Sequence, residues 1–405
     1  MSKSSRRFLK DLVREVKPGF ACGETDPDGI FQVRMNNVTK SGNIDLTKQR
    51  RVPRSHPGVG KTELLPGDVL FNATNSPDLV GKTLFWSGLD EGAVYSNHFQ
   101  RIRTDEKQLD SKYLSRWLAF QFELGIFRSL CKQWVNQATV ARDSLLALRV
   151  PLLPLAEQKR VAAVLDQVDA LRAKRRKAIT LLDELAQSIF LDMFGNPARN
   201  PLGWPVGKVG DLLISANYGS SVKADLAGDV PVLRMNNVTA SGDVDMCDLK
   251  YLPKEQVPEK HLVRAGDVLF NRTNSAELVG KTAIYRSAEE VAYAGYLVRL
   301  RVSEGHHPEY LAAFLNSRYA KRVLRSMSKS IVGMANINAK QVQAMNILVP
   351  PLAEQKRFAA AITQIEAAKK PHRTHLATLD ELFTSLQHRA FSGTLWDHEA
   401  SGEAA

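Results

Sequence analysis

The sequence predicts an α+β fold, in which two pseudo-symmetric α/β domains are joined by two long helices packed as an antiparallel coiled coil. Three observations lead to this prediction. Blocks of sequence recur in the same order about 200 residues apart, each copy begins with short apolar runs between turns, and each copy ends with apolar residues at heptad spacing. The chain has 405 residues, which is enough for two or three domains with buried cores.

The internal repeat is the strongest signal in the chain. RMNNVTKSGNID, from residue 34, returns as RMNNVTASGDVD from residue 234. GDVLFNATNSPDLVGKT, from residue 67, returns from residue 266 as GDVLFNRTNSAELVGKT, and PLAEQKR stands at 154–160 and 351–357. The offset changes only from 200 to 197, so the sequence encodes a tandem duplication of a unit of about 200 residues.

The first part of each copy mixes short strands with helices. The expected strands are apolar runs bounded by turn residues: Asp68–Phe71, Asp267–Phe270, Phe99–Arg103 and Leu297–Arg301. Helical stretches follow at about Ser111–Gln133 and Pro308–Arg325. Together these elements predict a compact α+β domain in each copy.

The second part of each copy predicts a long helix. Glu157–Phe194 contains neither Pro nor Gly and would span about 57 Å at 1.5 Å per residue. Its apolar residues alternate in steps of three and four, the spacing of a coiled-coil seam: Val161, Leu165, Val168, Leu171, Ala178, Leu182, Leu185 and Ile189. The second copy repeats the seam, but Pro371 interrupts it, and we expect a bend there. Packed on each other, the helices would form a rod with a domain near each end.

Composition narrows the class of protein. The net charge of +12 permits a polyanionic partner, and no run approaches the 18 apolar residues of a membrane helix, so no membrane is expected. The three cysteines, Cys22, Cys131 and Cys247, are far apart and odd in number, which argues against disulfides and zinc. We expect a protein of the reducing cytoplasm.

No motif for enzymatic chemistry is complete. GKT occurs at 60–62, 81–83 and 280–282, but the glycine that a phosphate-binding loop needs five residues earlier is a serine each time, so the triplets read as β-turns with outward lysines. His372 and His375 could share a helix face, but further metal ligands are missing. We therefore expect no catalytic residues, no cofactor and no metal.

The duplicated polar blocks are the candidate DNA-binding residues. Asn can bond adenine, Arg can bond guanine, and Ser or Thr can bond phosphate or base. The candidates are Arg34, Asn36, Asn37, Thr39, Asn72, Thr74, Asn75 and Lys82 in the first copy, and Arg234, Asn236, Asn237, Thr239, Asn271, Arg272, Thr273, Asn274 and Lys281 in the second. The alternative stays open, because the same residue types build turns by bonding their own backbone.

These motifs resemble those of the specificity (S, HsdS) subunits of type I restriction-modification systems. The resemblance rests on RMNNVT-SG-ID, GDVLFN-TNS, LVGKT, ANINA at 335–339 and the doubled PLAEQKR, and it covers about residues 1–395. It implies target recognition domains at 1–150 and 198–347 and helical spacers at 151–197 and 348–395. The mostly small and polar residues at 396–405 predict a disordered tail.

The resemblance also implies a function. Each recognition domain would read one half of a bipartite site in double-stranded DNA, and the spacer would set the gap and dock two methyltransferase (M) subunits. The chain itself would be non-catalytic, with methylation and ATP-dependent cleavage in the M and restriction (R) subunits. One alternative is the specificity subunit of a related type IIB-like or fused modification system, which differs only in partner. The other is a nuclease or ATPase acting alone, which the broken motifs disfavour.

The two copies also differ. Ala73 aligns with Arg272, and NQATVA at 136–141 aligns with MANINA at 334–339. Arg can add a bidentate contact to guanine where Ala offers only a methyl group. We therefore expect two half-sites that agree at some positions and differ at one or more.

Overall fold

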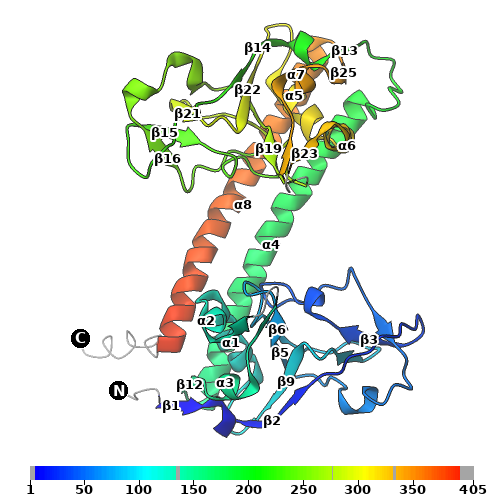
Figure 1. Ribbon diagram of the computed structural model, residues 1–405, viewed down its shortest axis with the longest axis vertical. Coiled ribbons are helices and arrows are strands. Elements are labelled where there is room, and N and C mark those ends of the chain that lie inside the picture. The colour runs from blue at the N-terminus through cyan, green and yellow to red at the C-terminus, as the bar shows by residue number, and fades with distance from the viewer. Residues whose placement is uncertain (1–4, 134–136, 276, 332–333, 393–405) are drawn as a thin grey trace. The chain divides into compact units, whose positions relative to one another are not determined.

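The computed structural model describes residues 5–133, 137–275, 277–331 and 334–392 (Figure 1). The chain divides into two compact units, the first made of Met1–Lys174 with Leu376–Ala405 and the second of Arg175–His375. Both long helices are shared between the units, so each unit is a recognition domain together with part of each helix. The tail expected at 396–405 lies outside the described residues.

Unit 1 is built mainly of short strands. Its strands are β1 (Ser5–Phe8), β2 (Val13–Pro18), β3 (Ile30–Val33), β4 (Arg51–Val52), β5 (Val69–Asn72), β6 (Thr74–Asn75), β7 (Thr83–Phe85), β8 (Ala93–Tyr95), β9 (Phe99–Thr104), β10 (Lys132–Gln133), β11 (Ala138–Thr139) and β12 (Arg149–Leu152). Its helices are α1 (Ser111–Glu123), α2 (Ile126–Leu130), α3 (Arg142–Leu146) and the 3-10 turns η1 (Leu9–Asp11), η2 (Met35–Asn37) and η3 (Val59–Lys61).

Unit 2 repeats most of this order of elements and adds a strand at Leu262–Val263. Its strands are β13 (Val206–Lys208), β14 (Leu213–Tyr218), β15 (Val230–Leu233), β16 (Lys250–Leu252), β17 (Leu262–Val263), β18 (Val268–Asn271), β19 (Thr273–Asn274), β20 (Thr282–Ile284), β21 (Val291–Tyr293), β22 (Leu297–Val302), β23 (Lys329–Ile331), β24 (Met334–Asn336) and β25 (Asn346–Leu348). Its helices are α5 (Pro308–Asn316), α6 (Arg318–Met327), α7 (Ala339–Gln343) and the 3-10 turns η4 (Val209–Leu212), η5 (Lys254–Gln256) and η6 (Glu259–His261). The sequence duplication is therefore a duplication of fold.

The sheets of the two units have matching topology. The central antiparallel sheet has the order β2-β9-β5-β7 in unit 1 and β14-β22-β18-β20 in unit 2. A second sheet contains β4-β3-β8 in unit 1 and β16-β15-β21-β17 in unit 2, and a small third sheet is β10-β11-β6 or β19-β24-β23. The third sheet carries the divergent segments around 138 and 335, so the copies differ there on a shared framework.

The repeated VLFN strand lies at the centre of each unit because both of its faces are buried. Val69 and Phe71 belong to the core formed with α1 and the long helices, whereas Leu70 belongs to a second core under β3 and β8. Strand β18 divides its residues between two cores in the same way. Since successive side chains of a strand point to opposite faces, a continuous apolar run is what such a position requires.

The long helices predicted from the sequence are confirmed as α4 (Leu155–Phe194) and α8 (Leu352–Ser392). α4 ends where Gly195 adopts a positive φ of 75° and donates its N–H to the Leu191 carbonyl at 2.9 Å, the usual glycine C-terminal cap. α8 continues through Pro371 without a break. The bend expected at this proline stays a prediction.

Within each unit the two helices run antiparallel. In unit 2, residue numbers fall along α8 as they rise along α4. Arg175 lies 3.4 Å from His372, Asp183 lies 2.6 Å from Lys369, and the rings of Phe190 and Phe194 both meet that of Phe358 edge to face. In unit 1, Arg172 binds Asp380 at 2.6 Å, and late residues of α8 such as Phe383 and Phe391 share a core with Val161 and Leu165.

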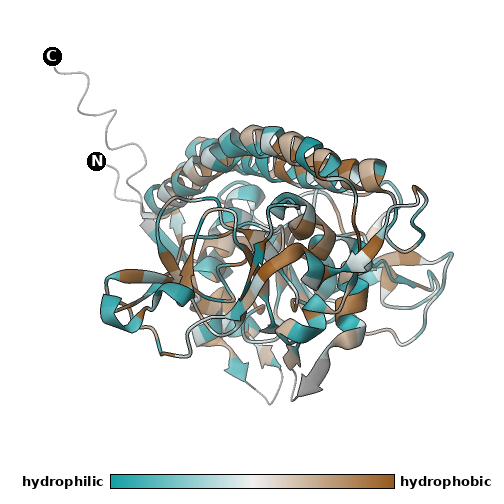
Figure 2. Cartoon of the chain, turned by 90° about the horizontal axis from the view of Figure 1, so that it is seen from above, coloured by the Kyte–Doolittle hydropathy of each residue, from teal (hydrophilic) through white to brown (hydrophobic). Residues whose placement is uncertain are grey.

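The expected apolar seam is only partly buried. Val161, Leu165 and Val168 are buried, but Leu171 is 43% exposed and Leu185 is 47% exposed. Near these positions the helices meet through ion pairs instead, and Figure 2 shows hydrophilic and hydrophobic residues alternating along both helices. A continuous coiled coil therefore remains a proposal.

The expected shorter elements are partly confirmed. Strands at Phe99–Thr104 and Leu297–Val302 match the prediction. The single helix expected over Ser111–Gln133 is wrong, because Gly125 has a left-handed φ of 73° and separates α1 from α2. The second predicted helix is likewise divided, because Ser317 is extended and caps the N-terminus of α6.

Candidate nucleic-acid interface

The RMNNVT turn follows β3 and is held together by its second asparagine. Asn37 is fully buried: its Oδ1 accepts the Arg34 N–H at 3.0 Å, and its Nδ2 donates to the carbonyls of Asp45 and Lys48 at 2.9 and 3.0 Å. Asn237 makes the matching bonds in unit 2. Both amides are bonded through oxygen and nitrogen inside the domain, which fits the scaffold alternative.

The asparagines that follow the VLFN core are also bound internally. Asn72 is fully buried and donates to the carbonyls of Thr74 and His98, while its Oδ1 accepts from Asn75 Nδ2 at 2.6 Å. In unit 2, Asn271 Nδ2 donates to the Met235 carbonyl, and its Oδ1 accepts the N–H of Thr273, which is itself buried. Asn75 and Asn274 each accept the N–H of the serine that follows, at 2.8 and 2.9 Å, so both close local turns.

The lysines of the second and third GKT point inward, which corrects the expectation of outward turn lysines. Lys82 is 5% exposed and donates to the carbonyls of Met35 and Val38, and Lys281 donates to the Met235 carbonyl at 3.0 Å. Burial lowers the pKa of both ammonium groups. Each lysine ties the GKT segment to the RMNNVT turn, which explains why the two motifs recur together. Lys61, in the first GKT, is exposed.

The threonines form turns or lie beside the third sheet. Thr39 Oγ1 accepts the Asn43 N–H at 3.0 Å, and Thr239 Oγ1 accepts the Asp243 N–H at 2.9 Å. Thr74 is half-buried, and its hydroxyl lies 3.2 Å from that of Thr139.

The arginine and the first asparagine of each turn keep contact with solvent. Asn36 and Asn236 are exposed, and Arg34 and Arg234 are half-buried. In unit 2, Arg234 Nη2 lies 3.0 Å from Asp248 Oδ2, and the same carboxylate accepts from Asn236 at 3.0 Å. Lys48 aligns with Asp248, and among the described residues none accepts a hydrogen bond from the Arg34 guanidinium. The first copy therefore presents a freer arginine than the second.

Arg272 lies at the edge of the third sheet of unit 2. Its guanidinium is 4.9 Å from the centre of the Tyr218 ring and donates to Asn336 Oδ1 at 3.1 Å. The ring and the amide hold the side chain in one orientation, which is what a bidentate donor to a base requires. The aligned Ala73 is buried, so only unit 2 has this group.

The sequence shows the PLAEQKR motif but not what its glutamine does. Gln158 is fully buried: its Oε1 accepts the Asp110 N–H at 2.9 Å, and its Nε2 donates to the Gln108 and Leu153 carbonyls at 2.9 and 2.8 Å. Gln355 bonds the His307 N–H and the Pro350 carbonyl in the same way. Through this glutamine, the start of α4 is hydrogen-bonded to the segment before α1, and the start of α8 to the segment before α5.

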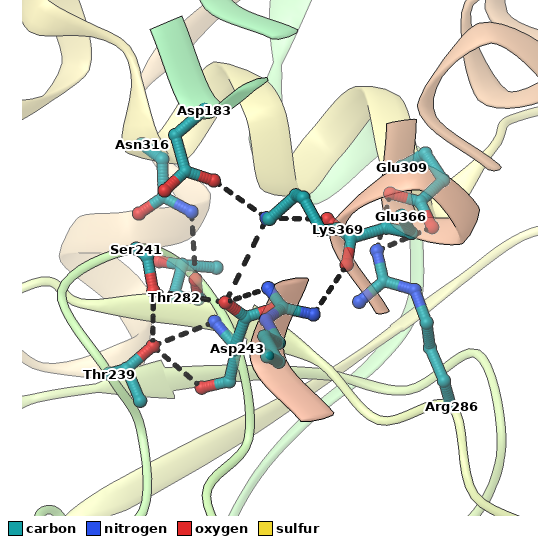
Figure 3. A network of polar contacts seen from close by, with 11 residues as sticks. Asp183, Thr239, Ser241, Asp243, Thr282, Arg286, Glu309, Asn316, Glu366 and Lys369 are labelled. Carbon is teal, nitrogen blue, oxygen red and sulfur yellow. Dashed lines mark hydrogen bonds and ion pairs between the residues drawn. The ribbon is translucent and has the colours of Figure 1, made fainter. Parts of the chain in front are cut away.

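A second feature that the sequence analysis did not find joins the polar turn of unit 2 to the helices (Figure 3). Lys369 Nζ lies 2.6 Å from Asp183, 2.7 Å from Glu366 and 4.0 Å from Asp243, and Arg373 Nη2 lies 2.7 Å from Asp243. Asp243 belongs to the turn that Thr239 closes. In unit 1 an asparagine, Asn43, aligns with Asp243. The comparison of the two ASGD and KSGN segments could have revealed this difference.

The structure gives less support to a metal site, a disulfide or a membrane helix. His372 lies near Arg175, and no cluster of His, Cys, Asp and Glu suited to a metal ion occurs among the residues that the structure describes. The three cysteines are free thiols. Within the described ranges, every helix is too short or too polar to cross a membrane.

Known proteins are similar to this chain in sequence and in fold. The model for the type I restriction modification DNA specificity domain matches residues 57–181 and 201–380. The type I restriction enzyme EcoKI specificity subunit of Escherichia coli (strain K12) is 25% identical over 390 residues, which are 91% of this chain and 83% of that protein. The EcoBI specificity subunit of Escherichia coli is 23% identical over 433 residues, covering 96% of this chain and 86% of the relative.

A solved structure agrees in fold. The S subunit of a type I restriction-modification system from M. genitalium covers 96% of both chains with a TM-score of 0.58 at 12% sequence identity. The matched residues of the family model make up well over half of the sequence and fall in both units. The chain therefore belongs to the family of type I restriction modification DNA specificity domains.

Proposed function

We propose that this chain is the DNA sequence-specificity subunit of a type I restriction-modification system. Each unit would read one half of a bipartite site in double-stranded DNA. The observation that carries this proposal is the duplication of one fold with a polar turn at the same place in each copy, within a family of DNA specificity domains. A protein with two equivalent reading domains is suited to a site made of two halves separated by a gap.

The candidate residues divide into two groups. The buried amides and lysines serve as scaffold, because their polar atoms are bonded within the domain. We propose that bases are read by Arg34 and Asn36 in unit 1 and by Arg234, Asn236 and Arg272 in unit 2, since these side chains are at least partly exposed and do not close the turns. Arginine and asparagine are the side chains that bond bidentately to guanine and adenine.

The long helices would hold the two reading units and dock the partners. We infer that α4 and α8 form the spacer, that its length sets the gap between the half-sites, and that one methyltransferase subunit binds beside each unit. EcoKI and EcoBI are named as type I restriction enzymes, and the chain is similar to their specificity subunits over most of its length. Methylation and ATP-dependent cleavage would lie in the methyltransferase and restriction subunits.

The test uses two single variants in the complex with the methyltransferase. Arg34→Ala should relax the sequence read at one half-site, and Arg234→Ala should relax the other, each by about 1–3 kcal/mol of discrimination. Each variant is the control for the other, because the half-site read by the unchanged unit should keep its sequence. Sequencing the methylated bases of a host genome measures both half-sites at once.

Two results would contradict the proposal. One is a methylated site without a gap. The other is an unchanged site and unchanged DNA affinity in both variants. Co-purification should also yield two methyltransferase subunits per chain, and a single copy at partner excess would refute the docking of one subunit beside each unit.

A further inference from the structure

Helix α6 of unit 2 carries three arginines on one face. Arg318, Arg322 and Arg325 are exposed and stand at positions i, i+4 and i+7, so they form a line along the helix, here called the arginine stripe. The opposite face is apolar, with Ala320 and Leu324 fully buried in the unit 2 core. The helix thus presents a cationic edge to solvent.

The arginine stripe has no acidic partner within the part of the chain that the structure describes. None of its three guanidinium groups forms an ion pair with a described residue. Like charges at i and i+4 destabilise a helix, and α6 has no acidic residue in its first turn, where cations oppose the helix dipole. The stripe therefore weakens its own helix unless an anion binds there.

Helix α6, which carries the arginine stripe, belongs to the same unit as the proposed reading residues Arg234, Asn236 and Arg272. Lys321 Nζ donates to the Gly280 carbonyl, and Gln341 Nε2 donates to the Met327 carbonyl at 3.0 Å. Burial, together with the nearby Arg325 and Lys281, lowers the pKa of Lys321 to about 8, so this ammonium serves the fold and is not part of the stripe. Figure 1 shows α6 beside β23, an outer strand of the sheet that adjoins Arg272.

Unit 1 differs at the aligned positions. The residues aligned with the arginine stripe are Gln121, Gly125 and Arg128, and the helix there, α2, has only 5 residues. Arg128 is neutralised by Asp78 at 3.2 Å. The difference between the copies is therefore in charge and in helix length together.

We propose that the arginine stripe binds the phosphates of DNA beside the half-site read by unit 2, independently of base sequence. The proposal rests on the proposed function and adds an anchoring surface that the aligned residues of unit 1 lack. Four and seven residues of helix span about 6 and 10.5 Å, the scale of two and three base-pair rises of about 3.4 Å measured along the DNA axis. Arginine also suits phosphate because its planar donors bond two oxygens at once.

The experiment measures salt-dependent DNA binding by the full chain in complex with its methyltransferase subunits. The test variant is Arg318→Gln, Arg322→Gln, Arg325→Gln. The control is Lys223→Gln, Lys254→Gln, Lys260→Gln, which removes the same charge from exposed positions of the same unit. Losing three phosphate contacts should lower the slope of log affinity against log salt by about 3, and should weaken cognate and scrambled DNA by the same factor.

Four outcomes would overturn the proposal. A slope equal to that of the wild-type complex excludes phosphate contacts, and a selective loss of cognate binding means that the arginines read bases. Failure of the variant to hold the methyltransferase means that the arginine stripe docks protein. If the triple variant does not fold, Arg322→Gln alone should lower the slope by about 1, and no change there is equally decisive. Failure of the wild-type complex to bind any bipartite site would instead contradict the proposed function.

Discussion

Replacing Lys369 should destabilise unit 2 more than its location on a long, largely exposed helix suggests. Its side chain is only 4% exposed and binds Asp183 at 2.6 Å and Glu366 at 2.7 Å, with Asp243 at 4.0 Å. Lys369→Met keeps the apolar stem but leaves the three carboxylates with Arg373 as their remaining cation in this network. The carboxylates would then repel one another at a site with little water.

The loss in free energy of unfolding caused by Lys369→Met follows from how deeply the charged side chains are buried. Removing one partner of a fully buried ion pair costs about 3–5 kcal/mol. Asp183, Glu366 and Asp243 are 27%, 24% and 24% exposed, so water reaches them in part, and we expect about 2–3 kcal/mol. For a unit of this size, that loss lowers the melting temperature by about 4–12 °C.

The control variant for Lys369→Met is suggested by the aligned residue of unit 1. Arg172 aligns with Lys369 and makes the equivalent contacts to Asp169 at 3.1 Å and Asp380 at 2.6 Å in unit 1. Lys369→Arg should therefore keep most of the stability that Lys369→Met loses. Urea unfolding followed by circular dichroism measures both variants.

The stability that Lys369→Met loses should also depend on pH. Burial alone raises the pKa of Glu366, but hydrogen bonds from Lys369 and Arg373 outweigh burial and hold it below the ordinary value of 4.5. A carboxyl whose folded pKa is lowered contributes stability above its unfolded pKa and loses it as pH falls through the folded one. The difference between wild type and Lys369→Met should shrink below about pH 4.5. A Met variant as stable as wild type at pH 7, or a difference that stays constant down to about pH 3, would refute this reasoning.

Three further changes test the remaining polar contacts. Asp243→Asn, which installs the residue found in unit 1, should lose about 1 kcal/mol by thermal unfolding because Arg373 loses its charged acceptor; an equal or higher stability would show that this pair contributes nothing. Gln158→Ala should cost about 2–3 kcal/mol in urea unfolding, since it leaves one buried donor and two acceptors without their partner, whereas the exposed Gln256→Ala should be neutral. Lys82→Ala should lower stability by about 2 kcal/mol without changing the salt dependence of DNA binding, and a lower salt slope would instead identify Lys82 as a phosphate contact.

The repeats and the long helices can be predicted from the sequence because their signals are local and duplicated. The VLFN runs predict buried strands, and Glu157–Phe194 predicts a long helix because it contains neither Gly nor Pro. The break at Gly125 is harder to predict, because an isolated glycine within a helical pattern is either tolerated or adopts the positive φ that separates the two helices here.

The site is harder to predict because one residue type can serve two purposes. Asn37 and Asn36 are neighbours of the same type, yet one is fully buried and the other is exposed. Which of them faces solvent is decided by the carbonyls that the turn brings together, and those come from residues 8 and 11 positions further along the chain. The inward direction of Lys82 depends on the carbonyls of Met35 and Val38, which belong to a different motif far earlier in the chain, so no local pattern could reveal it.

The composition of unit 1 has a consequence for the order of folding during synthesis. Its core joins Val161 and Leu165 to Phe383 and Phe391, which are synthesised only after the whole of unit 2. At about 5–20 residues per second, the ribosome delivers these covering residues about 11–46 s after the face that they bury. Unit 2 is contiguous and can close first, whereas the apolar face of unit 1 stays uncovered until the end of α8 has been synthesised.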